Sequence, residues 1–331
     1  MTMETEQQTF SDKRFVDTSS PPATAYRTTS AFGLEDGLPK IGEILGDCTL
    51  EQIVHVGNMV VVYRGISAFS GADFAIKICR LSSSKAYRRA FVLKRNLHAK
   101  LNSPEMASFN TGGIWNGELP YSIISYYEGR TLQNILENVT CIPSLIVLAI
   151  GKMVLEALKN SCEKIESTGW AGYLYRCIWS ISPDNIMITK VGDLKILDIG
   201  LEQFFDDRLA LDMKWQELPP PQYSTTMDLS TAIYSVGTFF LSMLYGWSES
   251  IEMLSDPALL SKKQKHSEIL QIIRKCMTGK LGTGYTGFDE IVEDTEAGLR
   301  LLSTASAQEI IKAWFLEGKT MRKKPKLKPP F

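Results

Sequence analysis

The segment ISPDNIMITKVGDLKILDIG, residues 181–200, contains two side chains that are typical ligands of a hard metal ion. Asn185 stands near its start, and Asp198 follows thirteen positions later as the first residue of an Asp-x-Gly sequence. Between them, two short β-branched runs flank the turn-like residues 190–193, a pattern that predicts a β-hairpin. A hairpin brings its two ends together, and carboxylate and amide oxygens suit Mg²⁺. The pattern therefore predicts a metal site, although Asn and Asp are also common turn residues.

A second residue with possible chemistry is Lys77, which lies within the apolar run FAIKI, residues 74–78. A lysine in such a run is costly to bury unless an anion meets its ammonium group. One interpretation is an anion-binding lysine. The other is a side chain that reaches water at the edge of a strand.

The composition is that of an ordinary globular protein. Of the 331 residues, 44% are apolar and 22% are charged, and 36 Lys and Arg nearly balance 37 Asp and Glu. The resulting net charge of -1 argues against a nucleic-acid partner. Six scattered cysteines without a CxxC pair, and only three histidines, argue against a structural zinc site and favour a reducing compartment.

Two features of the sequence indicate where the protein works. The N-terminal residues MTMETEQQTF contain no apolar segment of the kind found in secretory signals. The most apolar long stretch, residues 230–246, is shorter than the about 20 residues that a membrane span requires, so it predicts a buried core helix. We therefore expect a cytoplasmic protein without a membrane span, although export as an effector also fits the sequence.

Along the chain, a strand-rich part is followed by a helix-rich part between two tails. Residues 1–40 have the polar composition of a disordered tail, and residues 317–331 form a basic tail. Residues 41–127 predict mostly strands with one helix, and residues 128–316 predict mostly helices around the hairpin. We expect an α+β fold with a small β-rich N-lobe and a larger α-helical C-lobe.

The order and spacing of these segments resemble the protein kinase superfamily over residues 41–316. FAIKI is similar to the third-strand motif VAIK, ISPDNIMI to the catalytic-loop stretch LKPENILI, and LKILDIG to the DFG segment. YSIISYYEGRTL resembles the hinge between the lobes, and PPPQY resembles the APE element. AIYSVGTFFLSMLYG resembles the buried central helix, and TASAQEIIKAWF resembles the last helix. Seven such segments in the family's order make a specific signal, and they imply a two-lobed protein-kinase-like fold.

This resemblance implies a site for ATP and Mg²⁺ between the lobes. It places Lys77 at the lysine that pairs with ATP phosphates, and Asn185 and Asp198 at the metal ligands. Gly57 falls at the middle glycine of the phosphate-covering loop. Four apolar residues are implied to line the adenine pocket, although each would also pack as ordinary core: Val62, Ala75, Ile124 and Met187.

The catalytic base and two loop glycines of the family are absent. The base aspartate falls at Ser180, and serine accepts a substrate proton poorly at neutral pH, whereas such a base is typically worth about 10²- to 10⁴-fold in rate. In the phosphate-covering loop, His55 and Val60 replace the first and third glycines, which restricts the approach of the backbone to phosphate.

The helix glutamate that pairs with the ATP-binding lysine is absent as well. Its position falls at Lys94, and two neighbouring ammonium groups would repel each other. Either the helix is therefore rotated outward, or Lys77 is held by Asp198.

These departures lead to the hypothesis of a pseudokinase that acts as a scaffold or allosteric regulator of a protein partner, with ATP binding left open. One alternative is an atypical serine/threonine kinase that transfers the γ-phosphate to protein slowly, by positioning alone. Another is a nucleotide sensor that binds ATP without turnover. A formal GxGxxG at residues 282–287 follows a helical stretch rather than a strand, so it predicts a loop and not a dinucleotide site.

Overall fold

The structure is a computed structural model that describes seven stretches of the chain. They are residues 37–101, 103–138, 142–166, 181–198, 229–255, 267–278 and 284–317. Most of both predicted tails lies outside the described residues, and so does the catalytic-loop position Ser180.

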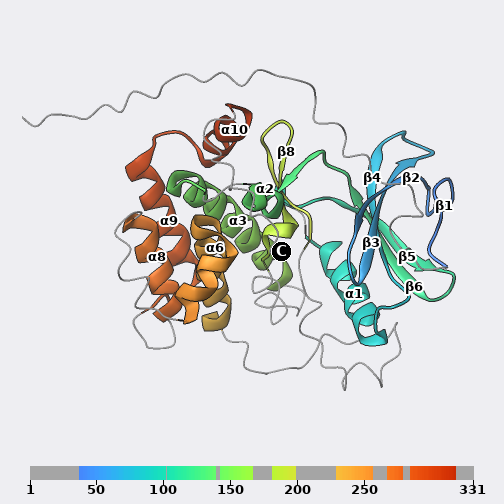
Figure 1. Cartoon of the computed structure of the whole chain (residues 1–331), viewed down its shortest axis with the longest axis horizontal. Coiled ribbons are helices and arrows are strands. Elements are labelled where there is room, and N and C mark those ends of the chain that lie inside the picture. Colours follow the sequence, from blue (N-terminus) through green and yellow to red (C-terminus); the bar gives the residue numbers. More distant parts are fainter. Residues whose placement is uncertain are drawn as a thin grey trace, which may run out of the picture. The chain divides into compact units, whose positions relative to one another are not determined.

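Six strands form an antiparallel sheet in the order β1-β2-β3-β4-β6-β5 (Figure 1). Their bounds are Ile44–Leu45 (β1), Cys48–Val56 (β2), Val60–Ser67 (β3), Asp73–Cys79 (β4), Phe109–Trp115 (β5) and Leu119–Ser125 (β6). The runs rich in β-branched and aromatic residues form these strands, as such residues pack well on a pleated surface. The predicted strand-rich part of the chain is therefore confirmed.

Pairing within this sheet aligns several predicted site residues. In β3, Val61 is fully buried whereas Val62 is half-buried, which is the alternation of a strand whose faces have different surroundings. Val62 lies opposite Lys77 of β4, and Ala75 of β4 lies opposite Ile124 of β6. Because opposed residues and alternate residues share a face, these four side chains lie on one face of the sheet.

Helix α1, Lys85–His98, is fixed against the sheet by polar bonds. The hydroxyl of Ser84 caps its first turn by accepting a backbone N–H at 3.1 Å. Arg95 Nη1 donates to the carbonyl oxygen of Gly113 on β5 at 3.0 Å and to that of Tyr121 on β6 at 3.3 Å. These bonds set the rotation of α1 and hence the direction in which its other side chains point.

The packed structure begins a few residues before the predicted boundary at residue 41. The hydroxyl of Tyr63 donates to the carbonyl oxygen of Pro39 at 2.9 Å. The indole N–H of Trp115 donates to the carbonyl oxygen of Gly37 at 3.1 Å. This short segment therefore belongs to the β-rich part of the fold.

A second, three-stranded sheet contains the hairpin that the sequence predicts. It has the order β7-β8-β9, with bounds Gly129–Thr131, Ile186–Thr189 and Leu194–Ile196. Beside it, the backbone N–H of Ala107 donates to the carbonyl oxygen of Ile196 at 2.9 Å. The end of β9 is thus joined to the segment that follows α1.

The helix-rich part follows as predicted (Figure 1). Its helices are α2 (Leu132–Asn138), α3 (Ser144–Glu166), α6 (Leu229–Ser255), α8 (Ser267–Thr278), α9 (Phe288–Leu302) and α10 (Ala307–Glu317). Helix α3 packs against α9 and α10, and α6 packs against α8. Buried aliphatic residues of these helices form one continuous core, which Leu97 of α1 and Met106 also join. The hydrophobic core therefore connects α1 to the helix-rich part.

Helix α6 contains the core helix predicted at residues 230–246. The hydroxyl of Ser242, although buried, donates to the carbonyl oxygen of Phe239 at 2.8 Å, so this polar group is satisfied within the helix. The helix is broken at Gly246, whose φ of 76° favours glycine. Within the described residues, no helix is both long and apolar enough to cross a membrane.

Two glycines give a test of the helix packing. A Cβ at Gly151 of α3 would lie 2.0 Å from Cε1 of Phe240, which is fully buried in α6. We expect Gly151→Ala to lower the free energy of unfolding, because overpacking costs about 1–3 kcal/mol and exceeds the helix-propensity gain of about 1 kcal/mol. The matched control is Gly298→Ala in α9, where the new Cβ would lie 3.5 Å from Leu148. This control should gain about 0.5–1 kcal/mol in urea unfolding; an equal gain in both variants would contradict the packing of α3 on α6.

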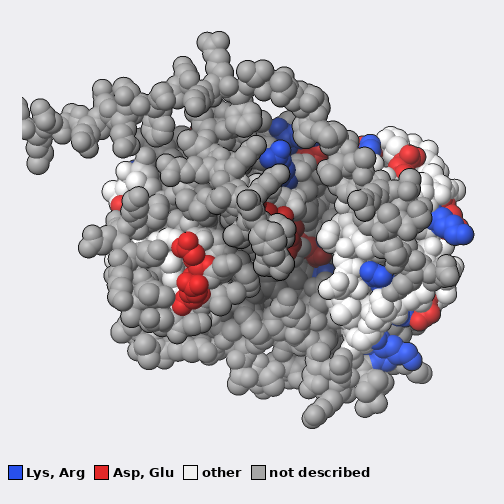
Figure 2. Space-filling view, viewed as in Figure 1, with Lys and Arg blue, Asp and Glu red and all other residues white. Residues whose placement is uncertain are grey.

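The described surface carries charges of both signs, and three of the described thiols are buried. On the face shown in Figure 2, basic and acidic side chains lie interspersed over the part that carries the strands. Cys48, Cys79 and Cys276 are free and buried, and burial raises the pKa of the Cys79 thiol to about 12. These three thiols are therefore protonated near neutral pH.

Candidate functional site

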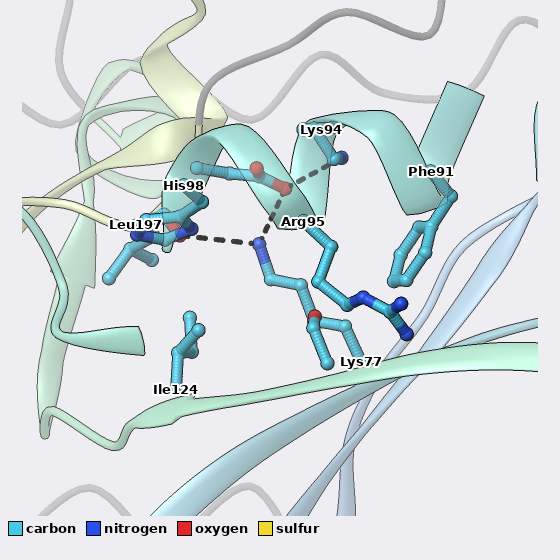
Figure 3. A pocket seen from close by; sticks show the side chains of 9 residues that line it. Lys77, Phe91, Lys94, Arg95, His98, Ile124 and Leu197 are labelled. Carbon is cyan, nitrogen blue, oxygen red and sulfur yellow. Dashed lines mark hydrogen bonds and ion pairs between the residues drawn. The ribbon is translucent and has the colours of Figure 1, made fainter. Parts of the chain in front are cut away.

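The carboxylate of Asp198 lies between two lysines that come from different elements. Figure 3 shows these two lysines, Lys77 and Lys94, at the pocket. Its Oδ2 accepts a hydrogen bond from Lys77 Nζ of β4 at 2.7 Å and from Lys94 Nζ of α1 at 3.0 Å. The exposed fractions of these side chains are 15% for Lys77, 6% for Lys94 and 12% for Asp198, so all three charges are largely removed from water. One carboxylate therefore serves as the counter-ion of two ammonium groups.

The sequence left two arrangements of Lys77 open, an outward rotation of α1 or a contact of Lys77 with Asp198, and the structure has the second. Lys77 is held by Asp198, and α1 is oriented so that Lys94 reaches the same carboxylate. The repulsion expected between the two ammonium groups is offset because both donate to one oxygen atom. Lys94 does not pair with Lys77 as the glutamate of protein kinases does. It contacts Asp198 instead and so belongs to the site.

One face of α1 lines a small pocket around these groups. Phe91, Lys94, Arg95 and His98 have the spacing i, i+3, i+4, i+7, which places them on one side of a helix. The ring of His98 donates from Nε2 to the carbonyl oxygen of Ala107 at 2.7 Å. The other lining residues are Lys77, Ser122, Ile124, Leu197 and Asp198.

The pocket is nearly filled by its own side chains. The volume open to the centre of a water molecule is about 10 Å³, which is on the order of the minimum needed to hold one water. A larger ligand must therefore meet Lys77 and Asp198 from their exposed side, since both side chains keep a partial exposure.

Burial and neighbouring charges set the ionisation states. Burial by itself raises the pKa of Asp198, but Lys77 and Lys94 outweigh it, and the net pKa lies well below its usual range. Burial lowers the pKa of Lys94 below its usual value, and the attraction of Asp198 offsets this only in part. Burial also lowers the pKa of His98, so that its ring is neutral near pH 7. The ionised Asp198 thus stabilises the fold above its unfolded pKa of about 3.9, and this contribution is lost as the pH falls further.

The hairpin between β2 and β3 carries Gly57, the residue predicted to be the middle glycine of a phosphate-covering loop. Its N–H donates to the carbonyl oxygen of Val60 at 2.8 Å, and its own carbonyl accepts Arg80 Nη1 at 3.1 Å. A Cβ at Gly57 would lie 3.2 Å from His55 Nε2 and 3.3 Å from the carbonyl oxygen of Val60. The residues that replace the family's other glycines therefore crowd the one that remains.

The predicted metal ligands lie at the two open ends of the β8–β9 hairpin. Asn185 ends a short 3-10 turn, η2 (Pro183–Asn185), and its carbonyl oxygen accepts the N–H of Leu197 at 2.7 Å. The hairpin therefore brings Asn185 beside the backbone that leads to Asp198, as the sequence predicts. Metal binding by these two residues stays a prediction.

The charges around Asp198 fit an anion better than a divalent cation. Mg²⁺ bound to Oδ2 at about 2.1 Å would lie within about 5 Å of both ammonium groups. At an effective dielectric of 20, each ammonium group would repel it by about 7 kcal/mol. Within the described stretches, no group of three or more His, Cys, Asp and Glu side chains is placed to hold a metal ion. The phosphates of a nucleotide, in contrast, match the charge of Lys77 and Lys94.

The structure brings part of the predicted nucleotide site together. Lys77, Ile124 and Asp198 line the same pocket, and Val62 and Ala75 lie on the same face of the sheet as Lys77. Four predicted nucleotide-binding residues are absent from the pocket lining: Val62 and Ala75 on this face, Gly57 at its hairpin, and Met187, half-buried, on β8. Sequence reasoning missed the contributions of α1 and of Ser122, which lies opposite Lys77 in the sheet. The helical spacing of the α1 residues was a signal for their shared face, whereas the position of Ser122 depends on the strand register.

Comparison with curated proteins finds bacterial protein kinases. A probable serine/threonine-protein kinase of Clostridium perfringens strain 13 is 26% identical over 215 residues, which are 62% of this chain and 30% of that protein. The serine/threonine-protein kinase PknB of Mycolicibacterium smegmatis is 26% identical over 220 residues, 62% of this chain and 32% of that protein. No family model matches the chain.

Comparison with solved structures finds kinase domains. The PknI kinase domain of Mycobacterium tuberculosis has a TM-score of 0.57 at 15% identity, and the match covers 79% of this chain and 99% of that one. The chain contains a protein-kinase-like domain. The predicted α+β, two-lobed fold, with a β-rich N-lobe and an α-helical C-lobe, is confirmed. The kinase-like domain matches about 30% of the length of its curated relatives.

Proposed function

We propose that the kinase-like domain is a pseudokinase that binds a nucleotide between its lobes and acts as a scaffold or allosteric regulator of a protein partner. The observation that carries this proposal is the position of Asp198 between Lys77 and Lys94. In protein kinases, the corresponding aspartate holds metal ions that neutralise charge on the transferred phosphate. Here the carboxylate is engaged as an internal counter-ion.

The sequence indicates a second loss, that of the catalytic base which would accept the proton of the substrate. Ser180 stands where the family has its base, and such a base contributes about 10²- to 10⁴-fold. Phosphoryl transfer relies on positioning of the reacting groups and on electrostatic stabilisation of the transition state. The loss of the base and the engagement of Asp198 by two lysines weaken both of these contributions. We therefore propose that transfer to a substrate is not the main activity of the domain.

Nucleotide binding is supported by the face of the sheet that carries Lys77. Val62, Ala75 and Ile124 supply apolar surface on that face, and Val62 and Ala75 are only half-buried by the protein itself. Such a surface suits an adenine ring, and the ammonium group of Lys77 suits its phosphates. We also propose that the domain spans residues 41–316, with its N-lobe ending at residue 127.

Thermal unfolding tests the nucleotide part of this proposal. A ligand at 100 times its Kd adds about 2.7 kcal/mol to stability, which raises the Tm of a domain of this size by a few degrees. We expect ATP to produce such a shift in the wild-type chain and none in Lys77→Ala. The matched control is Lys85→Ala, because Lys85 is an exposed lysine on α1, and it should keep the shift. A wild-type chain without a shift at millimolar ATP would contradict nucleotide binding.

The alternative of an atypical serine/threonine kinase is favoured by one feature. Lys77 and Asp198 are retained and in contact, and Asn185 lies at the adjacent end of the hairpin. Incubation with γ-labelled ATP and a protein substrate separates the two functions. The pseudokinase proposal expects no incorporation above a heat-denatured control. Incorporation that disappears in Asp198→Ala would instead support the slow kinase.

A further inference from the structure

We infer that the domain binds nucleotide phosphates without a divalent cation, and that Lys94 supplies the positive charge that a metal ion supplies in a protein kinase. This inference rests on the proposed nucleotide binding and deepens it. It concerns Lys94, which in the sequence marks only the absence of the helix glutamate that pairs with the ATP-binding lysine.

The first support is the position of the ammonium group of Lys94. It lies 3.0 Å from Oδ2 of Asp198, the carboxylate expected to hold a metal ion. The side chain is only 6% exposed, and its element is fixed to the sheet through Arg95. The cation is therefore built into the fold and is not a mobile surface lysine.

The second support is the charge of the pocket as a whole. Its lining contains three cationic side chains, Lys77, Lys94 and Arg95, and one carboxylate, Asp198. Counted as formal charges, with the ring of His98 taken as neutral, these side chains leave an excess of two positive charges. A divalent cation would increase an excess that is already present, whereas the phosphates of a nucleoside di- or triphosphate would neutralise it.

The third support is the geometry of the shared carboxylate. Lys77 and Lys94 both donate to Oδ2, so the two ammonium groups are held close together beside Asp198 (Figure 3). Two cations held on one anion present a positive surface to a further anion, as a metal ion held by a carboxylate does. Lys77 is 15% exposed and Asp198 12% exposed, so a phosphate can approach from that side.

Calorimetric titration of the full chain with ATP, in EDTA and in Mg²⁺, tests the inference. We expect the wild-type Kd in EDTA to lie within about threefold of the Kd in Mg²⁺. Lys94→Gln should raise the Kd in EDTA by about tenfold or more, and Mg²⁺ should restore binding in this variant. Lys94→Arg, which keeps the charge, and Lys85→Gln, an exposed lysine of the same helix, should behave like the wild type.

The outcomes separate this inference from the function on which it rests. Binding by the wild type only in Mg²⁺, or equal binding by wild type and Lys94→Gln in EDTA, overturns the role of Lys94 and leaves nucleotide binding intact. Loss of binding by Lys94→Gln in both conditions also overturns it, because a metal ion should then replace the lost charge. No binding by the wild type in either condition overturns the proposed nucleotide binding itself.

Discussion

Replacing Asp198 by asparagine is expected to lower the free energy of unfolding by about 3–5 kcal/mol. The change removes the carboxylate that both Lys77 and Lys94 contact and leaves two largely buried ammonium groups beside each other. Breaking a buried ion pair from one side is strongly destabilising because the remaining charge keeps its desolvation cost. Urea unfolding monitored by tryptophan fluorescence measures this loss.

A matched control for this change lies in the same hairpin region. Asp184 is exposed, and its Oδ2 accepts only a long hydrogen bond of 3.5 Å from the hydroxyl of Ser182. Asp184→Asn makes the same chemical change and should alter stability by no more than about 0.5 kcal/mol. Equal stability of the Asp198 and Asp184 variants would show that Asp198 does not serve as the counter-ion of the two lysines.

The second large effect is expected from Lys94→Glu. The new carboxylate would face Asp198 in place of the ammonium group that now lies 3.0 Å from it. Two like charges about 4 Å apart repel by about 4 kcal/mol at an effective dielectric of 20, and the present attraction is lost as well. We therefore expect a loss of several kcal/mol in the free energy of unfolding, partly offset by a new contact with Lys77.

Lys94→Met provides the comparison for this variant. It removes the buried cation without adding an anion, and Asp198 keeps Lys77 as its partner. The methionine variant should therefore be clearly more stable than the glutamate variant. The opposite order, with Lys94→Glu as stable as the wild type, would indicate that residue 94 pairs with Lys77 alone, as the family's glutamate does.

The sequence predicts the backbone of the site better than its contacts. The β8–β9 hairpin and the position of Lys77 on a strand follow from β-branched runs and turn residues, which are local signals. The sharing of Asp198 by two lysines depends on the rotation of α1, and this is set by bonds from Arg95 to two strands far along the chain. No local pattern contains that information, which is why two arrangements of Lys77 stayed open.

The residues missed by the sequence analysis have a similar explanation. Phe91 and His98 line the pocket only because α1 turns one face toward Asp198. Their helical spacing identifies a shared face, but it does not say which group that face meets. Ser122 lies opposite Lys77 because of the strand register between β4 and β6, which the sequence does not specify by itself.

The central claim is that Asp198 serves as the counter-ion of Lys94, and a double-mutant cycle tests it most directly. The free energies of unfolding are measured for the wild type, Lys94→Met, Asp198→Asn and the double variant in EDTA. We expect a coupling energy of about 2 kcal/mol or more, because removing the carboxylate costs less once Lys94 is gone. Additivity within about 0.5 kcal/mol would mean that the two side chains do not interact, and it would contradict the role of Asp198 as a shared counter-ion.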